Sequence, residues 1–413
     1  MKNTSIVSAG NPPRSSESAP SVAPGMVRIE SIDFLRGLAM ILMALDHTRM
    51  YFALGTWYAE PTDLGTTTPL LFFTRWITHF CAPVFVFLAG TSALLYGIKK
   101  DKRETASFLL TRGLWLVFVE LAIVNFAWTF DITYSFRILQ VIWAIGLSMV
   151  ALSALVFLPE YLILALGTIL VFGHNLLDPI TVRGSDLQAL AWYTLHQPNS
   201  VFIDGTLINF VYPVLPWIGL MALGYVCGIL YQHDFPAEQR KKWLLGIGVA
   251  ATLLFVLLRA FNGYGESHEW AVQSSSVFSL LSFLNTTKYP PSLHFLLMTM
   301  GPAFILLALF EPVRNRLPKP VIVFGRVPFF FYILHLYVIH ALATLLLVSQ
   351  GGEWTDYIFS AENLTSGALR DFGLPLGAVY VIWAVVIVLL YPLCKWYHRY
   401  REKNPSKWWL RYL

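Results

Sequence analysis

The stretch RGLAMILMALDH, residues 36–47, decides the fold class because it places charged groups in an apolar helical run. Arg36 opens an uncharged and largely apolar segment, and Asp46 and His47 close it. A charged side chain at the centre of a membrane helix costs about 2.5–3.5 kcal/mol. The stretch therefore predicts a membrane helix whose charged groups face a polar cavity within the protein rather than lipid.

The helical repeat brings Arg36 and His47 to one face of this helix. Eleven residues turn through about 1100°, which is three turns and about 20°, so the two residues lie about 16 Å apart along the axis. Asp33 precedes Arg36 by three residues and lies near the same face. Asp46 points about 100° away from His47, so we expect it to pair with another helix or with Arg49.

The composition indicates a polytopic membrane protein. Of 413 residues, 56% are hydrophobic and only 13% are charged, whereas soluble domains carry about a quarter charged residues. The formal net charge is +5, but the basic residues fall in short clusters between apolar segments. That pattern is typical of membrane topology and excludes a nucleic-acid partner.

Ten apolar stretches are long enough to suggest transmembrane helices. They predict an all-α polytopic membrane protein with about ten spans, at about 31–53, 69–98, 106–127, 138–157, 160–177, 208–231, 243–260, 293–310, 320–347 and 375–396. The apolar segment 274–284 is too short to span and is expected to be re-entrant or interfacial.

Basic clusters in alternate loops set the orientation. They lie at 99–103, at 240–242, at Arg314, Arg316 and Lys319, and from Lys395 to Arg411. The positive-inside rule then places both termini in the cytoplasm. We therefore expect a multi-pass protein of the cell (inner or plasma) membrane. We expect a disordered cytoplasmic tail at 1–27, a transmembrane domain at 28–398 and a basic cytoplasmic tail at 399–413.

Three segments carry a family resemblance: RIESIDFLRGLAMILMALDHTRMYF at 28–52, FFTRWITHFCAPVFVFLAGTSALLYG at 72–97 and GRVPFFFYILHLYVIH at 325–340. They resemble a bacterial branch of the heparan-alpha-glucosaminide N-acetyltransferase catalytic-domain family. The Arg-x10-His spacing is also similar to the first helix of bacterial integral-membrane O-acyltransferases. The resemblance implies that the 28–398 domain transfers an acetyl group from cytoplasmic acetyl-CoA to an acceptor on the far side of the membrane.

This resemblance assigns roles to the first helix. Arg36 would contact the phosphates of CoA at the cytoplasmic end, and His47 would lie where the thioester ends, with Asp46 beside it. The lysosomal enzyme has an asparagine at the position of His47 and its proposed catalytic histidine in the following loop. No histidine occurs from 48 to 78 here, so His47 is the better candidate for the general base. An interface anchor at Arg36 and a buried hydrogen bond at His47 remain alternative interpretations.

Further candidates lie on other helices. His79 follows Arg75 by one turn and is either a second base or a hydrogen-bonding support for the helix at Pro83. His335 and His340 lie about 140° apart on one helix, so we expect only His335 to face the cavity. Arg326 offers a second phosphate contact or, equally, a membrane anchor.

These histidines show neither HxxH nor HExxH spacing, so the sequence predicts no metal site. Cys81, Cys227 and Cys394 each lie in an apolar run and are expected to be packed thiols.

Two function classes remain. The first is an acyl-CoA-dependent membrane acetyltransferase, and the second is a proton- or ion-coupled transporter with a buried His/Asp/Arg relay. A transporter often shows inverted repeats with broken helices, and no such repeat is evident. The acceptor, whether a sugar, a glycan or a lipid-linked group, stays open, and a homodimer is compatible with the sequence.

Overall fold

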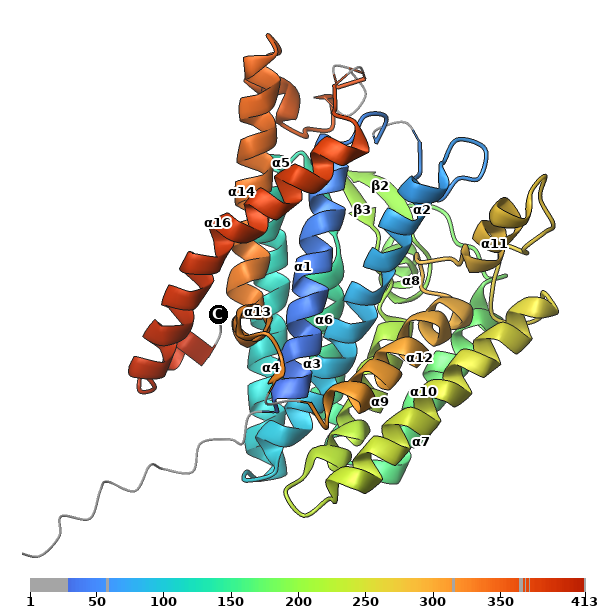
Figure 1. Cartoon of the computed structure of the whole chain (residues 1–413), viewed down its shortest axis with the longest axis vertical. Helices are drawn as coiled ribbons and strands as arrows, with labels where there is room; N and C mark the ends of the chain where they lie inside the picture. The colour runs from blue at the N-terminus through green and yellow to red at the C-terminus, as the bar shows by residue number, and fades with distance from the viewer. Residues whose placement is uncertain are drawn as a thin grey trace, which may run out of the picture.

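The computed structural model is mostly helical (Figure 1). It describes residues 29–56, 59–313, 316–363, 367, 369–370 and 372–411. The predicted tail at 1–27 and Arg314 lie outside the described residues.

The first half of the chain alternates long helices with short irregular turns. Its elements are α1 (Glu30–Phe52), α2 (Pro69–Trp76), η1 (Ile77–Phe80), α3 (Cys81–Gly97), α4 (Lys102–Val119), η2 (Glu120–Val124), α5 (Asn125–Thr129), β1 (Phe136–Leu139), α6 (Val141–Leu155), α7 (Glu160–Gly173), η3 (His174–Leu177) and α8 (Leu187–Leu195).

The second half adds a hairpin and the remaining helices. Its elements are β2 (Asn199–Ile203), β3 (Thr206–Phe210), α9 (Leu215–Cys227), η4 (Gly228–Tyr231), α10 (Ala237–Ala260), α11 (Ser276–Leu284), α12 (Leu293–Phe310), α13 (Lys319–Arg326), α14 (Pro328–Ser349), η6 (Trp354–Tyr357), α16 (Leu376–Lys403) and η7 (Trp408–Arg411).

Seven helical segments within the described residues are long and apolar enough to cross a membrane. They are Pro69–Gly97, Lys102–Thr129, Glu160–Leu177, Ala237–Ala260, Leu293–Phe310, Pro328–Ser349 and Leu376–Lys403. Three more of the predicted spans also contain helices. Val141–Leu155 and Leu215–Tyr231 are apolar but shorter than a full span, and α1 carries several charged residues.

Helix α1 lies in the middle of the molecule (Figure 1) and contacts α3, α12, α13, α14 and α16. Its charged groups therefore face other helices of the protein, which avoids most of the cost of exposing them to lipid. Gly37 and Gly325 permit the close crossing of α1 and α13. A Cβ at Gly325 would overlap the carbonyl of Asp33, and one at Gly37 would overlap the carbonyl of Val321.

Two predicted spans have different boundaries in the structure. The 320–347 stretch is two helices that meet at Val327, because Pro328 disfavours helical geometry in the residue before it. The 208–231 stretch begins as strand β3, and its helix begins only at Leu215.

A small sheet at one end of the bundle was not predicted. Its strand order is β1-β3-β2, with β1 parallel to β3 and β2 antiparallel to β3. The β2–β3 turn uses Asp204 and Gly205, both with positive φ, which suits a tight hairpin. The short segment predicted at 274–284 is the nine-residue helix α11.

The loop between α5 and β1 is held by the carboxylate of Asp131. Its oxygens accept hydrogen bonds from the backbone N–H and the hydroxyl group of Thr133 and of Ser135, at 2.6–2.8 Å. Burial alone would raise the pKa of Asp131, but these hydrogen bonds lower its pKa below the usual range. The loop thereby fixes the chain that follows Trp128.

Candidate active site

His47 and His335 come together from α1 and α14. Nδ1 of His47 lies 2.7 Å from Nε2 of His335, and the two rings are nearly parallel, with an interplanar angle of 16°. Nδ1 of His335 lies 3.0 Å from the carbonyl oxygen of Phe331, one turn earlier on α14.

These contacts define the proton positions of a neutral pair. A carbonyl oxygen only accepts, so Nδ1 of His335 carries a proton and donates it to Phe331. Nε2 of His335 is then the acceptor, and Nδ1–H of His47 donates to it. Nε2 of His47 is left with a lone pair, and no described residue hydrogen bonds to it.

Trp128 holds the ring of His47 from another side. Its ring meets His47 edge-on, with ring centroids 4.8 Å apart. The carbonyl oxygen of Trp128 accepts a 2.7 Å hydrogen bond from the hydroxyl of Tyr51, one turn beyond His47 on α1. Packing and one hydrogen bond thus restrain the imidazole in a single orientation.

Asp46 turns away from His47, as its position on the helix predicted. Its Oδ1 accepts from Arg49 at 3.1 Å, and its Oδ2 accepts from Arg75 on α2. Asp46 therefore anchors α1 to α2 and makes no hydrogen bond to His47 within the described structure.

His79 lies apart from the histidine pair. It is buried in η1, and its ring packs against Phe295 at a centroid distance of 5.3 Å. Its Nδ1 has no hydrogen-bond partner among the described residues. No hydrogen bond or ring contact recorded in the described structure joins His79 to His47 or His335.

His340 occupies a packing site separate from the pair of His47 and His335. Nδ1 lies 2.9 Å from the carbonyl oxygen of Ala127, and Nε2 lies 2.9 Å from that of Tyr357. Its ring stacks on Phe130 at a centroid distance of 3.7 Å. These contacts tie α14 to α5 and η6. The ring of His340 also contacts Tyr51 of α1, with centroids 4.9 Å apart, so His335 is the histidine of α14 that reaches His47.

Arg36 and Arg326 meet at the other end of α1. Both contact Asp33, Arg36 at 3.5 Å and Arg326 at 3.3 Å. Arg36 also donates to the carbonyl oxygen of Gly325 at 3.2 Å and to the hydroxyl of Ser92 at 3.1 Å. The side chains of Arg36 and Arg326 are 18% and 22% exposed, so the helix crossing presents two adjacent cations at a partly open surface.

Comparison with known families assigns the chain. The sequence profile of the heparan-alpha-glucosaminide N-acetyltransferase catalytic domain matches residues 28–259, more than half of the chain. The chain belongs to this family. No curated protein matches it.

Membership in the heparan-alpha-glucosaminide N-acetyltransferase family supports a membrane acetyltransferase and does not favour a transporter. The matched region contains Arg36, Asp46, His47 and His79, whereas Arg326 and His335 lie beyond it. Both of these residues nevertheless contact α1, which lies within the matched region: His335 contacts His47, and Arg326 contacts Asp33.

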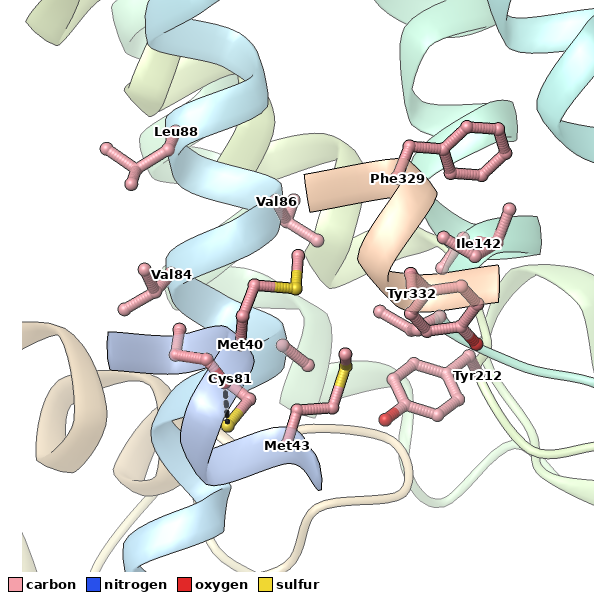
Figure 2. Close-up of a cluster of buried hydrophobic side chains, with 14 of the residues drawn as sticks. Met40, Met43, Cys81, Val84, Val86, Leu88, Ile142, Tyr212, Phe329 and Tyr332 are labelled. Atoms are coloured by element: carbon pink, nitrogen blue, oxygen red, sulfur yellow. Dashed lines mark hydrogen bonds between the residues drawn. The ribbon is translucent and has the colours of Figure 1, made fainter. Parts of the chain in front are cut away.

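Met40 and Met43 lie between the two polar ends of this face. They follow Arg36 at positions i+4 and i+7, on the side of α1 that also carries His47. Figure 2 shows both side chains in a buried apolar cluster that includes Val86 of α3 and Tyr332 of α14. Methionine side chains are flexible and polarizable, so Met40 and Met43 can adjust their packing to the groups beside them.

One site residue was not found from the sequence. Trp128 comes from a segment far from α1 along the chain, so no spacing rule links it to His47. Within the described residues, no cluster of three or more His, Cys, Asp or Glu side chains could hold a metal ion.

Proposed function

We propose that the protein transfers an acetyl group from cytoplasmic acetyl-CoA to an external sugar, glycan or lipid-linked acceptor. The proposal includes ten membrane-crossing helices in the inner or plasma membrane, with both termini cytoplasmic. The ten would be the seven long apolar segments and three further helices, which are α1, α6, and α9 together with η4. In support, α10 and α16 leave most of their apolar windows exposed, as lipid-facing helices do.

The observation that carries the proposal is the hydrogen-bonded pair of His47 and His335. Nε2 of His47 would accept the proton of the acceptor amine or hydroxyl as that group attacks the thioester carbonyl. The hydrogen bond to His335 would hold the ring in the tautomer that has this nitrogen unprotonated. The C–S bond would then break, and the departing thiolate would take up the proton.

A covalent route would use the same nitrogen. Nε2 of His47 could attack the thioester itself and carry the acetyl group transiently before the acceptor displaces it. Both routes require His47 to be neutral, and both assign His335 as the residue that positions it. Asp46 would act indirectly, because Arg49 and Arg75 occupy both of its oxygens. His79 would support the helix break before α3.

Arg36 and Arg326 would bind the phosphates of acetyl-CoA. Arginine forks suit phosphate oxygens, and these two lie together at the partly open end of α1. Phosphate would compete with Asp33, which now contacts both. Met40 and Met43 would lie beside the pantetheine arm, which must cover about 16 Å from Arg36 to His47.

Acetyl transfer by the purified protein tests this proposal. The detergent-solubilised protein is given radiolabelled acetyl-CoA and glucosamine, and acetylated sugar is counted. We expect turnover in the wild type and a fall of about 10²–10⁴ in His47→Gln. The matched control is His233→Gln, because His233 is 91% exposed and hydrogen bonds to Asp234 in the loop before α10. Equal turnover in both variants would contradict the assignment of His47.

A further inference from the structure

The connection between α10 and α12 contains a long stretch without charge. Residues 270–287, which include α11, have no Asp, Glu, Lys or Arg. Charged side chains are the ones most often found at a water-exposed surface, so their absence indicates a different environment. The stretch contains the predicted re-entrant or interfacial segment 274–284, which has no part in the proposed function.

The outward side of α11 is apolar. Leu281 and Ser282 are buried against the protein, whereas Val277 and Leu280 are about half exposed. Val272, just before the helix, is 79% exposed. A helix on the surface of a soluble protein shows the opposite arrangement, with its apolar residues towards the core and its polar residues outside. Helix α11 therefore presents apolar side chains away from the protein.

Arg259, in the last turn of α10, holds α11 in this orientation. Its side chain is buried and donates hydrogen bonds to the carbonyl oxygens of Ser282, Phe283 and Asn285 at 2.8–3.0 Å. It also donates to the carbonyl oxygen of His268 at 2.6 Å. A cation is favourable at the C-terminal end of a helix, where the last carbonyl oxygens lack partners. Turning the apolar side of α11 inward would break these hydrogen bonds.

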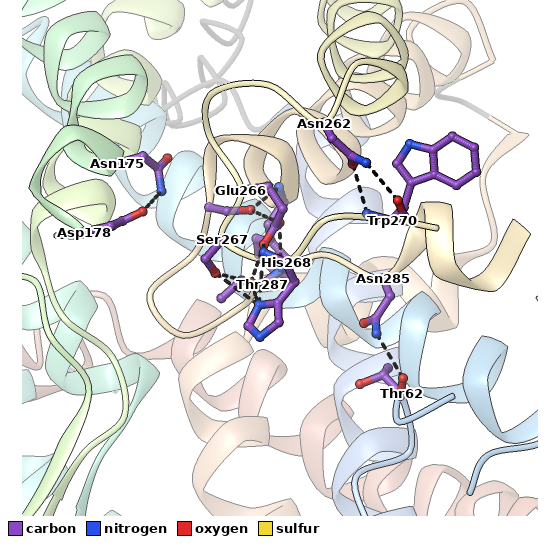
Figure 3. A network of polar contacts seen from close by, with 12 residues as sticks. Thr62, Asn175, Asp178, Asn262, Glu266, Ser267, His268, Trp270, Asn285 and Thr287 are labelled. Atoms are coloured by element: carbon purple, nitrogen blue, oxygen red, sulfur yellow. Dashed lines mark hydrogen bonds and ion pairs between the residues drawn. The ribbon is translucent and has the colours of Figure 1, made fainter. Parts of the chain in front are cut away.

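The chain on both sides of α11 is also held (Figure 3). The side chain of Asn262 donates to the carbonyl oxygen of Trp270 at 2.8 Å and accepts from its backbone N–H at 3.0 Å. After the helix, Asn285 donates to the carbonyl oxygen of Thr62 at 3.0 Å. These hydrogen bonds tie the segment to the end of α10 and to the loop that follows α1. The outward side of α11 is thus a fixed surface.

This surface continues the exposed apolar side of α10 (Figure 1). Leu253 and Leu257 of α10, and Phe261 just after it, are each more than half exposed. Helix α10 is apolar enough to cross a membrane, and only 22% of its apolar window is buried inside the protein. Because Arg259 joins α11 to the last turn of α10, the apolar side of α11 lies where α10 reaches the membrane surface.

We propose that α11 is an interfacial helix that binds the lipid surface at the membrane face where α10 ends. Its outward side, formed by Val272, Val277 and Leu280, lies between the headgroups and the upper part of the acyl chains. Because the segment carries no charge, burial of apolar area holds it there, and attraction to anionic lipids is not required. The inference goes beyond acetyl transfer and does not depend on it.

A nitroxide spin label measures the depth of α11 in a bilayer. Val277→Cys and Leu280→Cys are labelled in the full chain and reconstituted into phosphatidylcholine vesicles. Collision rates with oxygen, which concentrates in lipid, are compared with those of a nickel chelate, which stays in water. The ratio of oxygen to chelate collisions should be severalfold higher at both positions than in the matched control Arg183→Cys, at an exposed residue before α8. Labelling of the wild type measures the background from Cys81, Cys227 and Cys394.

Each other environment of α11 gives a different collision pattern. Chelate collisions at positions 277 and 280 as frequent as at 183 would place the helix in water and overturn the proposal. Few collisions with either reagent would show that protein, such as a second copy of the chain, covers this side, and would also overturn it. Addition of anionic phosphatidylglycerol should leave the ratio unchanged, and a depth reached only with anionic lipid would contradict binding by apolar burial. These readouts need no acetyl transfer, so they stand or fall separately from the proposed function.

Discussion

Replacement of His335 by glutamine probes the histidine pair without touching the nitrogen that would accept the proton. His335 hydrogen bonds to Nδ1 of His47 at 2.7 Å and also stacks on its ring. Loss of one partner of a buried hydrogen bond costs about 1–3 kcal/mol. If that hydrogen bond selects the reactive tautomer, the cost falls on the transition state and kcat should drop about 5- to 150-fold.

A double-mutant cycle shows whether the two histidines act as a unit. Once His47→Gln has removed the proton acceptor, the further change at His335 should cost little, because there is no longer a base to orient. Steady-state acetylation with labelled acetyl-CoA is measured for both single variants and the double variant. The reasoning is refuted if His335→Gln keeps kcat within twofold of wild type, or if the two effects multiply independently.

Three other predictions address the rest of the molecule. Arg36→Ala and Arg326→Ala should each weaken binding of CoA, measured by isothermal titration, while Arg36→Lys should restore only part of it because lysine lacks the bidentate fork; unchanged affinity would support a membrane anchor. Gly325→Ala should lower the melting temperature of the solubilised protein and the yield of folded protein, because the added methyl group overlaps the backbone of α1; a wild-type melting temperature would contradict the tight crossing. Asp131→Asn should destabilise the protein at neutral pH, and because the folded-state pKa of Asp131 is lowered, this difference should be full above about pH 4 and shrink as pH falls through the folded-state pKa; a difference that grew with acid would have the wrong sign.

The face of α1 followed from the sequence because helical periodicity is local. It correctly predicted that Asp46 points away from His47 and towards Arg49. It also separated His335, which contacts His47, from His340, which contacts Tyr51 farther along α1. The partner of His47 could not be identified by spacing, since His335 lies 288 residues away. Only the packing of α1 against α14 brings the two rings together.

Two predicted spans, 320–347 and 208–231, have different boundaries in the structure, and one of these differences could have been predicted from the sequence. Val327-Pro328 marks the end of α13, because a residue before proline avoids helical geometry, yet hydropathy alone joins α13 and α14 into one span. Strand β3 gave a weaker signal. Residues 206–210 are apolar enough to extend the helix that follows, and only pairing with β1 and β2 makes them a strand.

The sidedness of acetyl transfer tests the central claim most directly. The purified protein is reconstituted into sealed vesicles in one orientation, with radiolabelled acetyl-CoA on the cytoplasmic face and an impermeant sugar acceptor on the opposite face. The account predicts label on the enclosed acceptor in the wild type and none above background in His47→Gln. Transfer only when donor and acceptor share one face, or transfer that survives in His47→Gln, would contradict it.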